Sequence, residues 1–310
     1  MTGIRPGFRD ALWMAGGAAL LLLLFLVVLL FGRERGPDAR LALRAQRIDL
    51  VGRMQLGLAS ASEAEKSAVL AITDRESQEF ADQARASTAE VERQRRELAG
   101  LLDPGGTPEE KELLAQFSQH FGEFQKIDAE LLDLAVRNSN LKAYALTYGA
   151  AAGALDEMSA ALSRLVGANG DSKDAKEVIS LALGSQVAAL RIQTLLPPHI
   201  AEASDARMDE LEARIAREDQ QVQSDLQGLA ALQLQGDADL ALAESRYGQF
   251  REIQKQILSL SRENTNVRSL SISLNQKRQV MLVCHDLLSR LQEAIRKEPI
   301  PGVRFGGWFR

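Results

Sequence analysis

Residues 121–142 read FGEFQKIDAELLDLAVRNSNLK, and residues 247–268 read YGQFREIQKQILSLSRENTNVR. The two stretches align without a gap at a constant offset of about 126 positions. The alignment includes an Asn-Ser-Asn triplet at 138–140 and an Asn-Thr-Asn triplet at 264–266. A match of this length indicates an internal duplication, which has to be recognised before any other assignment is made.

Apolar residues in both copies recur with alternating three- and four-residue spacing, which is the seam of a helix packed in a bundle. In the first copy these are Phe124, Ile127, Leu131, Leu134, Leu141, Ala145 and Tyr148. Asn138 and Asn264 interrupt the two seams at matching places, so we expect them to form one polar layer in the core. A buried asparagine fixes helix register at some cost in stability. Membership of a ligand site and exposure to solvent are the alternatives.

Composition and charge exclude several classes of function. The chain has 310 residues and a formal net charge of −5 with interspersed charges, so a nucleic-acid partner is not expected. The single cysteine, Cys284, excludes an intrachain disulfide and a cysteine-based metal cage. No haem-attachment, zinc-protease, nucleophile-elbow or phosphate-loop motif occurs. We therefore expect no enzyme activity, no cofactor and no metal.

Residues 11–32 carry no charge and are long enough to cross a membrane as a helix, which takes about 20 apolar residues. They follow a tail at 1–10 and exceed the apolar region of a typical signal peptide, about 7–15 residues. We therefore predict an uncleaved transmembrane anchor, with a cleaved signal peptide as the alternative. Arginines in the linker at 33–44 argue for a cytoplasmic domain, although long domains translocate largely regardless of charge.

The rest of the chain predicts four long helices, at about 41–102, 108–166, 173–234 and 238–297. Thr107 and Glu110 form a capping box at the start of the second helix. The fold class is therefore all-α: a transmembrane helix followed by a long antiparallel up-down four-helix bundle over 45–298. Its two hairpins are repeats at about 45–166 and 174–298. A kink is expected at Pro197-Pro198, and two stacked shorter bundles are the alternative.

This arrangement resembles the four-helix-bundle sensory module of methyl-accepting chemotaxis proteins. The resemblance rests on residues 62–71 with Thr73-Asp74, and on residues 134–142. The variant with two stacked bundles resembles helical bimodular sensors. The resemblance implies an extracytoplasmic (periplasmic) domain on the inner membrane that binds a small molecule between its helices. After Lys297 we find no second apolar span and no transmitter, so we expect the signal to pass through a homodimer mate or a membrane transducer.

Glu65 is the residue that points most directly to a binding site, because seam spacing places its carboxylate inward and a buried charge needs a partner. Counted from the distal turn, Glu65 lies near Tyr144, Tyr148 and His199. We therefore predict a small-molecule site at this level, beside the Pro197-Pro198 break. The alternative is that Glu65 turns outward or pairs with a cation such as Lys66 or Lys142.

The C-terminal tail at 299–310 mixes aromatic and basic residues. Phe305, Trp308, Phe309 and Arg310 are suited to a membrane interface. A disordered tail and docking on a partner are the alternatives. The function that these features favour is a membrane-anchored, chemoreceptor-like sensory protein. A scaffolding bundle without a small-molecule ligand is the alternative.

Overall fold

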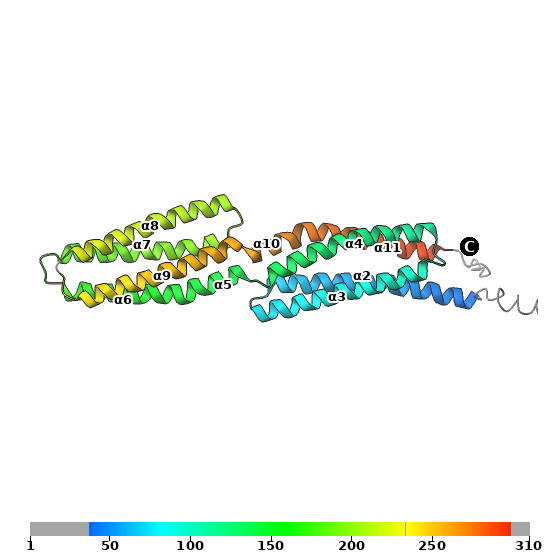
Figure 1. Cartoon of the computed structure of the whole chain (residues 1–310), viewed down its shortest axis with the longest axis horizontal. Coiled ribbons are helices and arrows are strands. Elements are labelled where there is room, and N and C mark those ends of the chain that lie inside the picture. Colours follow the sequence, from blue (N-terminus) through cyan, green and yellow to red (C-terminus); the bar gives the residue numbers. More distant parts are fainter. Residues whose placement is uncertain (1–36, 233, 299–310) are drawn as a thin grey trace, which may run out of the picture. The chain divides into compact units, whose positions relative to one another are not determined.

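The protein is described by a computed structural model over residues 37–232 and 234–298, and within these ranges it is helical apart from short turns (Figure 1). The elements are α2 (Pro37–Leu70), α3 (Asp74–Leu102), α4 (Pro108–Ala135), α5 (Ser139–Leu146), the π-helical turn η1 (Thr147–Ala151), α6 (Ala152–Ala168), α7 (Ala175–Ala201), α8 (Asp205–Ala231), α9 (Asp237–Glu263), α10 (Thr265–Ile272), the π-helical turn η2 (Ser273–Lys277) and α11 (Arg278–Lys297). The all-α class is thus confirmed for the described residues. The predicted transmembrane helix and the aromatic tail lie outside them.

The prediction of one continuous helix over 41–102 was wrong. The chain turns back at residues 71–73, so α2 and α3 form an antiparallel hairpin. Thr73 starts the new helix by accepting the Glu76 backbone N–H at 3.2 Å. The Ser77 hydroxyl donates to the Ala68 carbonyl across the hairpin at 2.9 Å. No proline or glycine marks this turn, and its only sequence signal is the cap at Thr73.

The helix predicted over 173–234 is also divided, into α7 and α8, by a turn at residues 202–204. Pro197 and Pro198 lie inside α7, which continues beyond them to its last turn. The break follows instead at Glu202, whose carboxylate accepts the backbone N–H groups of Ala203 and Ser204, both at 2.9 Å. A side chain that binds nearby backbone donors in this way competes with the helix.

The described residues divide into two compact units. The first contains residues up to 55, residues 92–117 and residues from 286 onward. In this unit Arg47 is buried, and one of its guanidinium nitrogens donates to the Leu101 carbonyl at 2.9 Å. Arg47 also lies 3.6 Å from the carboxylate of the buried Glu110.

The predicted capping box at the start of α4 is confirmed. The Glu110 carboxylate accepts the Thr107 backbone N–H at 3.0 Å, and the Thr107 hydroxyl accepts the Glu110 backbone N–H at 3.2 Å. Both of these N–H groups belong to the start of the helix, where no backbone partner exists. The start of α4 is therefore stabilised in the way that the sequence predicts.

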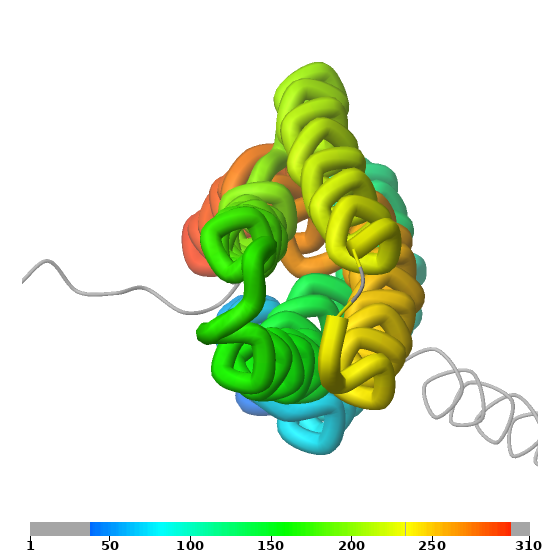
Figure 2. Tube along the Cα trace, turned by 90° about the vertical axis from the view of Figure 1, so that its left-hand side faces the viewer, coloured from blue at the N-terminus to red at the C-terminus, as the bar shows by residue number. Residues whose placement is uncertain are grey.

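The second unit, residues 56–91 and 118–285, contains two helical groups instead of one long bundle. The α7–α8 bundle is residues 139–263, and Figure 2 shows its helices α6 to α9 nearly end-on around a shared core. The α2–α3 bundle is residues 56–91, 118–135 and 265–285. Its core includes Ala64, Ala68, Ala81, Ala84, Leu131, Leu132 and Ala135. The prediction of a single long bundle is corrected to the stacked alternative. The reason is that the helices predicted over 41–102 and 173–234 each reverse direction near their middle.

The duplication is visible in the backbone of the second unit. Asn138 and Asn264 have positive φ angles of 51° and 53°, and no other non-glycine described residue has a positive φ. A π-helical turn follows each at the same distance, η1 and η2. Each π turn inserts one residue into the helix and rotates the residues after it. The copies therefore share their irregular features as well as their helices.

Candidate functional site

Asn138 and Asn264 each end one helix and begin the next within a few residues. Both are in the left-handed conformation, which asparagine tolerates better than other residues with a side chain. They do not sit on the seam of an uninterrupted helix, as the apolar spacing predicted. Each asparagine stands where the chain leaves one bundle of the second unit and enters the other.

The two triplets cap each other's helices. The Ser139 backbone N–H donates to the Thr265 hydroxyl at 3.1 Å, and the Thr265 backbone N–H donates to the Ser139 hydroxyl at 3.1 Å. Asn140 and Asn266 repeat the exchange, each accepting the other's backbone N–H through its side-chain oxygen, at 3.2 and 3.1 Å. These N–H groups begin α5 and α10 and lack helical acceptors. The duplicated motif is thus a reciprocal cap with local two-fold symmetry.

Side-chain amides complete this symmetric junction. The Asn140 amide donates to the Asn264 side-chain oxygen at 2.9 Å, and the Asn266 amide donates to that of Asn138 at 3.0 Å. All four are buried or half-buried. The polar layer expected at this height contains both Asn138 and Asn264, and it also includes the third residue of each triplet, Asn140 and Asn266.

Both hairpin tips are tied to the same junction. On the α2–α3 side, the Asn138 amide donates to the Asp74 carboxylate at 3.0 Å. On the α7–α8 side, Asn140 donates to the Ile200 carbonyl at 2.6 Å and Asn264 to the Glu202 carbonyl at 2.8 Å. A movement of either hairpin tip therefore acts directly on the triplets.

The α2–α3 bundle has a buried charged cluster at its centre. The ammonium group of Lys277, the last residue of η2, pairs with Glu65 of α2 at 3.2 Å and with Asp128 of α4. The Thr88 hydroxyl of α3 donates to the other Asp128 oxygen at 3.2 Å. The Lys277 ammonium also lies 4.9 Å from the centre of the Phe124 ring. The cluster joins four chain segments around one cation.

This cluster holds two carboxylates against one ammonium in the buried interior of the bundle. Lys277 and Glu65 are each 1 % exposed and Asp128 is 3 % exposed. The second oxygen of Glu65, Oε1, has no hydrogen-bond partner among the described residues. Buried charges are costly unless they are paired and hydrogen-bonded. The cluster is therefore sensitive to any displacement of α2.

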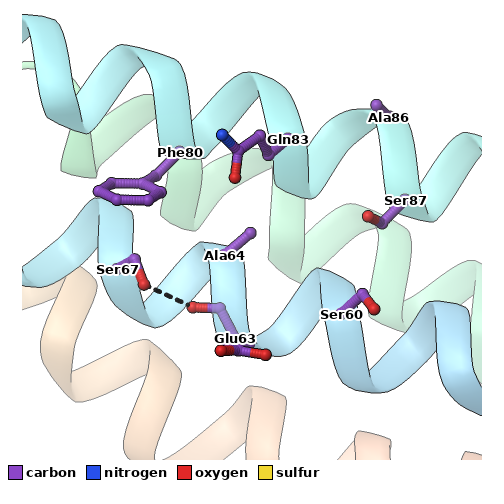
Figure 3. Close-up of a pocket in the computed structure, with 8 residues that line it drawn as sticks. All are labelled: Ser60, Glu63, Ala64, Ser67, Phe80, Gln83, Ala86 and Ser87. Atoms are coloured by element: carbon purple, nitrogen blue, oxygen red, sulfur yellow. Dashed lines mark hydrogen bonds between the residues drawn. The ribbon is translucent and has the colours of Figure 1, made fainter.

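A shallow groove of about 500 Å³ runs between α2 and α3 beside this cluster (Figure 3). Phe80 stands at one end and Ser60 and Ser87 at the other. Its lining residues are Ser60, Glu63, Ala64, Ser67, Phe80, Gln83, Ala86 and Ser87. Ala64 directly precedes Glu65, and Ser87 directly precedes Thr88. The two walls of the groove therefore carry two members of the charged cluster on their next residues.

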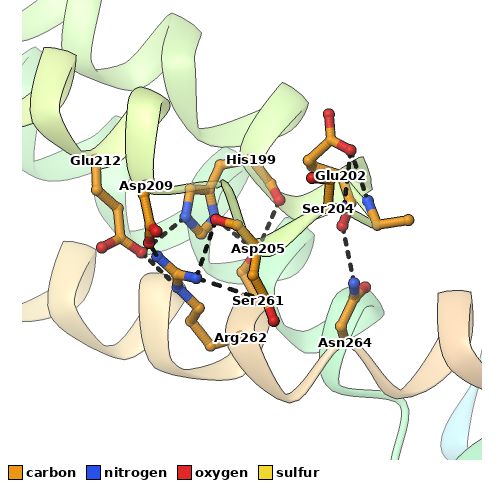
Figure 4. Close-up of polar contacts among 10 residues, drawn as sticks. His199, Glu202, Ser204, Asp205, Asp209, Glu212, Ser261, Arg262 and Asn264 are labelled. Atoms are coloured by element: carbon orange, nitrogen blue, oxygen red, sulfur yellow. Dashed lines mark hydrogen bonds and ion pairs between the residues drawn. The ribbon is translucent and has the colours of Figure 1, made fainter. Parts of the chain in front are cut away.

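His199 belongs to a separate polar network, in the α7–α8 bundle (Figure 4). It is fully buried, with Nδ1 2.7 Å from the Ser261 hydroxyl and Nε2 2.9 Å from the Glu212 carboxylate. Burial lowers the pKa of His199, and the hydrogen bond with Glu212 opposes this effect. The Ser261 hydroxyl also lies 3.0 Å from the His199 backbone carbonyl. A neutral ring, with Nε2–H donating to Glu212, fits these contacts when the single Ser261 proton is directed to Nδ1.

Arg262 extends this network to the surface. Its guanidinium donates to Glu212 at 2.7 Å and to Asp209 at 2.5 Å. The Arg262 side chain lowers the pKa of the Glu212 carboxyl, which keeps Glu212 ionised as an acceptor. The network holds α8 against α9 just beside the hairpin tip that contacts the junction.

The structure does not bring Glu65 together with Tyr144, Tyr148 and His199. Tyr144 is half-buried and its hydroxyl donates to the Pro197 carbonyl at 3.4 Å. Tyr148 is 66 % exposed and stacks on Tyr144 with ring centres 6.3 Å apart. These three residues belong to the α7–α8 bundle, whereas Glu65 belongs to the α2–α3 bundle. The predicted composite site is therefore replaced by separate clusters.

The error has a simple physical origin. The predicted register assumed that the first helix continues through residues 71–73, whereas the chain reverses there. The cation that pairs with Glu65 is Lys277, and Lys142 instead lies 3.4 Å from Asp74. No pattern in the sequence pointed to Lys277, which aligns at the 126-residue offset with Ala151, a residue that the structure shows to be buried.

Three further sequence predictions concern the membrane and metals. Phe305, Trp308, Phe309 and Arg310, like residues 11–32, lie outside the described residues. Within the described chain, one helix, α7 at Ala175–Ala201, is long and apolar enough to cross a membrane by length and composition. The core helix of a soluble protein passes the same test. In α7, 39 % of the most apolar window is buried. Residues 37–232 and 234–298 contain no group of three His, Cys, Asp or Glu side chains placed to hold a metal.

Comparison with known protein families supports the resemblance drawn from the sequence. Residues 57–179 match the family described as "Four helix bundle sensory module for signal transduction". The match covers less than half of the chain and contains the α2–α3 groove, Glu65, Asp128 and the first asparagine triplet. A comparison with curated proteins gives no matching relative. Residues 57–179 are therefore similar to the four-helix-bundle sensory module of signal-transduction proteins.

Proposed function

We propose that this protein is a membrane-anchored sensor that binds a small solute in the α2–α3 groove and signals through a partner. The observation that carries the proposal is the position of the groove. It lies in the segment that matches the sensory family, and its walls at Ala64 and Ser87 adjoin Glu65 and Thr88 of the charged cluster. A solute between the walls therefore acts on buried ion pairs.

The groove favours a neutral or cationic polar solute. Its lining offers three hydroxyl groups, a side-chain amide and the Glu63 carboxylate, with Phe80 as an aromatic wall. None of the described lining residues is basic, so the groove offers no counter-ion to an anion. Small-molecule sites typically measure about 300–1,000 Å³, which suits a compact metabolite here.

Signal transmission follows from the packing. A solute that separates α2 from α3 changes the distances from Glu65 and Thr88 to the Lys277–Asp128 pair. Packed helices respond to such changes by discrete sliding or rotation of about 1–2 Å. Lys277 closes η2, and α11 continues directly from it. The shift of α11 toward the C-terminus is the output that a homodimer mate or a membrane transducer reads.

The test is a thermal-shift screen of the full chain in detergent with a metabolite library. A solute present at a hundredfold excess over its Kd stabilises the folded state by about 2.7 kcal/mol. Ala86→Phe fills the groove and should abolish the shift. Ala89→Phe, also at an exposed position of α3 but outside the lining, should leave it unchanged.

Two results would redirect the proposal. If a solute raises the melting temperature equally in wild type and Ala86→Phe, the site lies elsewhere in the chain. If no solute acts and the chain instead co-purifies in a stable hetero-complex, the scaffolding alternative is favoured. Placement of the domain outside the cytoplasm rests on the predicted anchor at 11–32 and on the family resemblance. Protease accessibility in intact spheroplasts tests it.

A further inference from the structure

Helix α7 is apolar on two faces, and only one of them is packed. Its inner face contributes Val178, Ala182, Ala189, Ile192 and Leu196 to the core of the α7–α8 bundle. Its outer face exposes Ile179, Leu183, Val187 and Leu190, each between 40 % and 53 % accessible. The most apolar window of α7 has a mean hydropathy of 1.3, but only 39 % of this window is buried. A helix that is apolar all round is normally covered all round.

The outer residues follow the spacing of a helix seam. Ile179, Leu183, Val187 and Leu190, followed by the exposed Thr194, are separated by four, four, three and four positions. Steps of three and four residues present a line of side chains along one face to a second helix, whereas the flat surface of a lipid layer demands no such spacing. Interfacial helices also carry Lys or Arg along their polar edge, and from 178 to 190 α7 has neither. The spacing and the missing basic edge indicate a helical partner.

The outer apolar stripe of α7, formed by Ile179, Leu183, Val187 and Leu190, carries no charge and has a modest area. It contains no charged residue from Val178 to Leu190, and Arg191 at its edge is engaged by Glu218 of the same chain at 3.5 Å. Two copies therefore meet without like-charge repulsion. Four half-exposed side chains amount to a few hundred Å², below the roughly 800 Å² per partner of a standard stable interface. Such a contact suits copies already held close together.

We propose that the outer face of α7 packs in parallel against α7 of a second copy of this chain. The occupant is a second copy because the stripe is neutral, spaced for a helix and of an area that needs co-localisation to pair. Parallel pairing is the orientation that two copies adopt when both are anchored by the predicted helix at 11–32. In that arrangement every residue of the stripe lies next to its own counterpart.

Disulfide cross-linking of the full chain in proteoliposomes tests the contact. The native Cys284 is buried, and burial raises the pKa of its thiol to about 12, so it serves as a silent background. Leu183→Cys, Val187→Cys and Leu190→Cys should each give covalent dimers on mild oxidation. Ala216→Cys, at an exposed position of α8, should remain monomeric. Cross-linking at Val187→Cys alone indicates antiparallel pairing, and equal cross-linking at Ala216→Cys indicates random collision. Either result overturns the proposal.

A second measurement separates loss of contact from loss of folding. Leu183→Glu combined with Leu190→Glu places like charges in the stripe and should weaken dimerisation at least about tenfold. Leu56→Glu changes an exposed leucine of α2 and should have no effect. Sedimentation in matched detergent reports the association, and far-UV circular dichroism reports the helices. Unchanged dimerisation in the double variant rejects the α7 contact. Both assays are independent of solute binding in the α2–α3 groove.

Discussion

The α2–α3 bundle and the α7–α8 bundle share an ancestry but have different centres. At the 126-residue offset Asp128 aligns with Gln254, and Lys277 aligns with Ala151. In the α2–α3 bundle, Asp128 and Lys277 form a buried ion pair with each other. In the α7–α8 bundle the aligned glutamine and alanine are buried without charge. Duplication has thus preserved the irregular backbone, while the chemistry of the two centres has diverged.

The difference shows which features the fold requires. Both copies keep the left-handed asparagine and the π turn, so these belong to the architecture. Only the α2–α3 bundle contains the Asp128–Lys277 ion pair, to which each copy contributes one residue, so the fold does not need this pair. A buried ion pair is weak evidence for stability. Its restriction to the bundle with the groove is consistent with a role in signalling.

The largest effect expected is for Lys277→Met. The substitution leaves Glu65 and Asp128 buried without their cation, and breaking a buried pair in this way costs about 3–5 kcal/mol. Denaturant unfolding of the full chain in detergent, followed by far-UV circular dichroism, measures it. Ala151→Ser at the aligned position of the other bundle is the matched control and should cost far less. Equal losses at both positions would contradict the contrast between the two centres.

Removing the whole cluster should cost less than removing its cation. Glu65→Leu, Asp128→Leu and Lys277→Met together replace the ion pairs by apolar residues of similar size, a change that is often neutral or stabilising. We expect this triple variant to be more stable than Lys277→Met alone. The same variant should lose the solute-dependent signal if the cluster transmits it. A triple variant less stable than the single one would show that the charges stabilise the fold itself.

The asparagine junction should respond equally in the two copies. Asn138→Ala and Asn264→Ala each place alanine in the left-handed region, at about 1–2 kcal/mol, and each removes side-chain hydrogen bonds worth about 1 kcal/mol apiece. Glycine at either position should recover the stability lost to the left-handed backbone. It should not recover the stability lost with the side-chain hydrogen bonds. Unfolding of both pairs under the same conditions decides this, and a clear difference between the two sites would break the symmetry.

The pH response should come from the α7–α8 bundle. Because burial lowers the pKa of His199 below its usual 6.5, the unfolded chain binds the proton more readily. The contribution of neutral His199 to stability is therefore complete above pH 6.5 and is lost as the pH falls toward the folded pKa. His199→Gln should flatten the dependence of unfolding free energy on pH in this window. If the unfolding free energy of the variant keeps the same dependence on pH, this dependence comes from another group.

The smallest effect is expected at the duplicated glycines. Gly122 in α4 and Gly248 in α9 both occupy helix interiors, and an added Cβ would meet nothing within 4 Å at either site. Alanine should therefore stabilise each helix by about 0.5–1 kcal/mol. Gly57→Ala is the contrasting variant, because its Cβ would lie 2.6 Å from the Val91 side chain. A gain at Gly57 equal to that at Gly122 would show that α2 and α3 separate freely.

Local signals in the sequence were sufficient for the helical class, the duplication and the capping box at Thr107. These depend on apolar periodicity, on repeated residues and on side chains that bind backbone groups a few positions away. The asparagine triplets were also recognised, because a polar pair in a repeated apolar seam is conspicuous. Their conformation was not, since the left-handed backbone becomes favourable only when the two triplets can cap each other.

What only the tertiary structure decided is which segments meet. The reversals at 71–73 and 202–204 carry no proline or glycine, so the sequence alone indicated continuous helices and one long bundle. Once the chain turns back there, Glu65 pairs with Lys277 and His199 with Ser261 and Glu212, at sequence separations that no local pattern encodes. Periodicity determines which face of a helix is buried. The partner of each buried charge depends on the hairpin register, which is set by packing between distant segments.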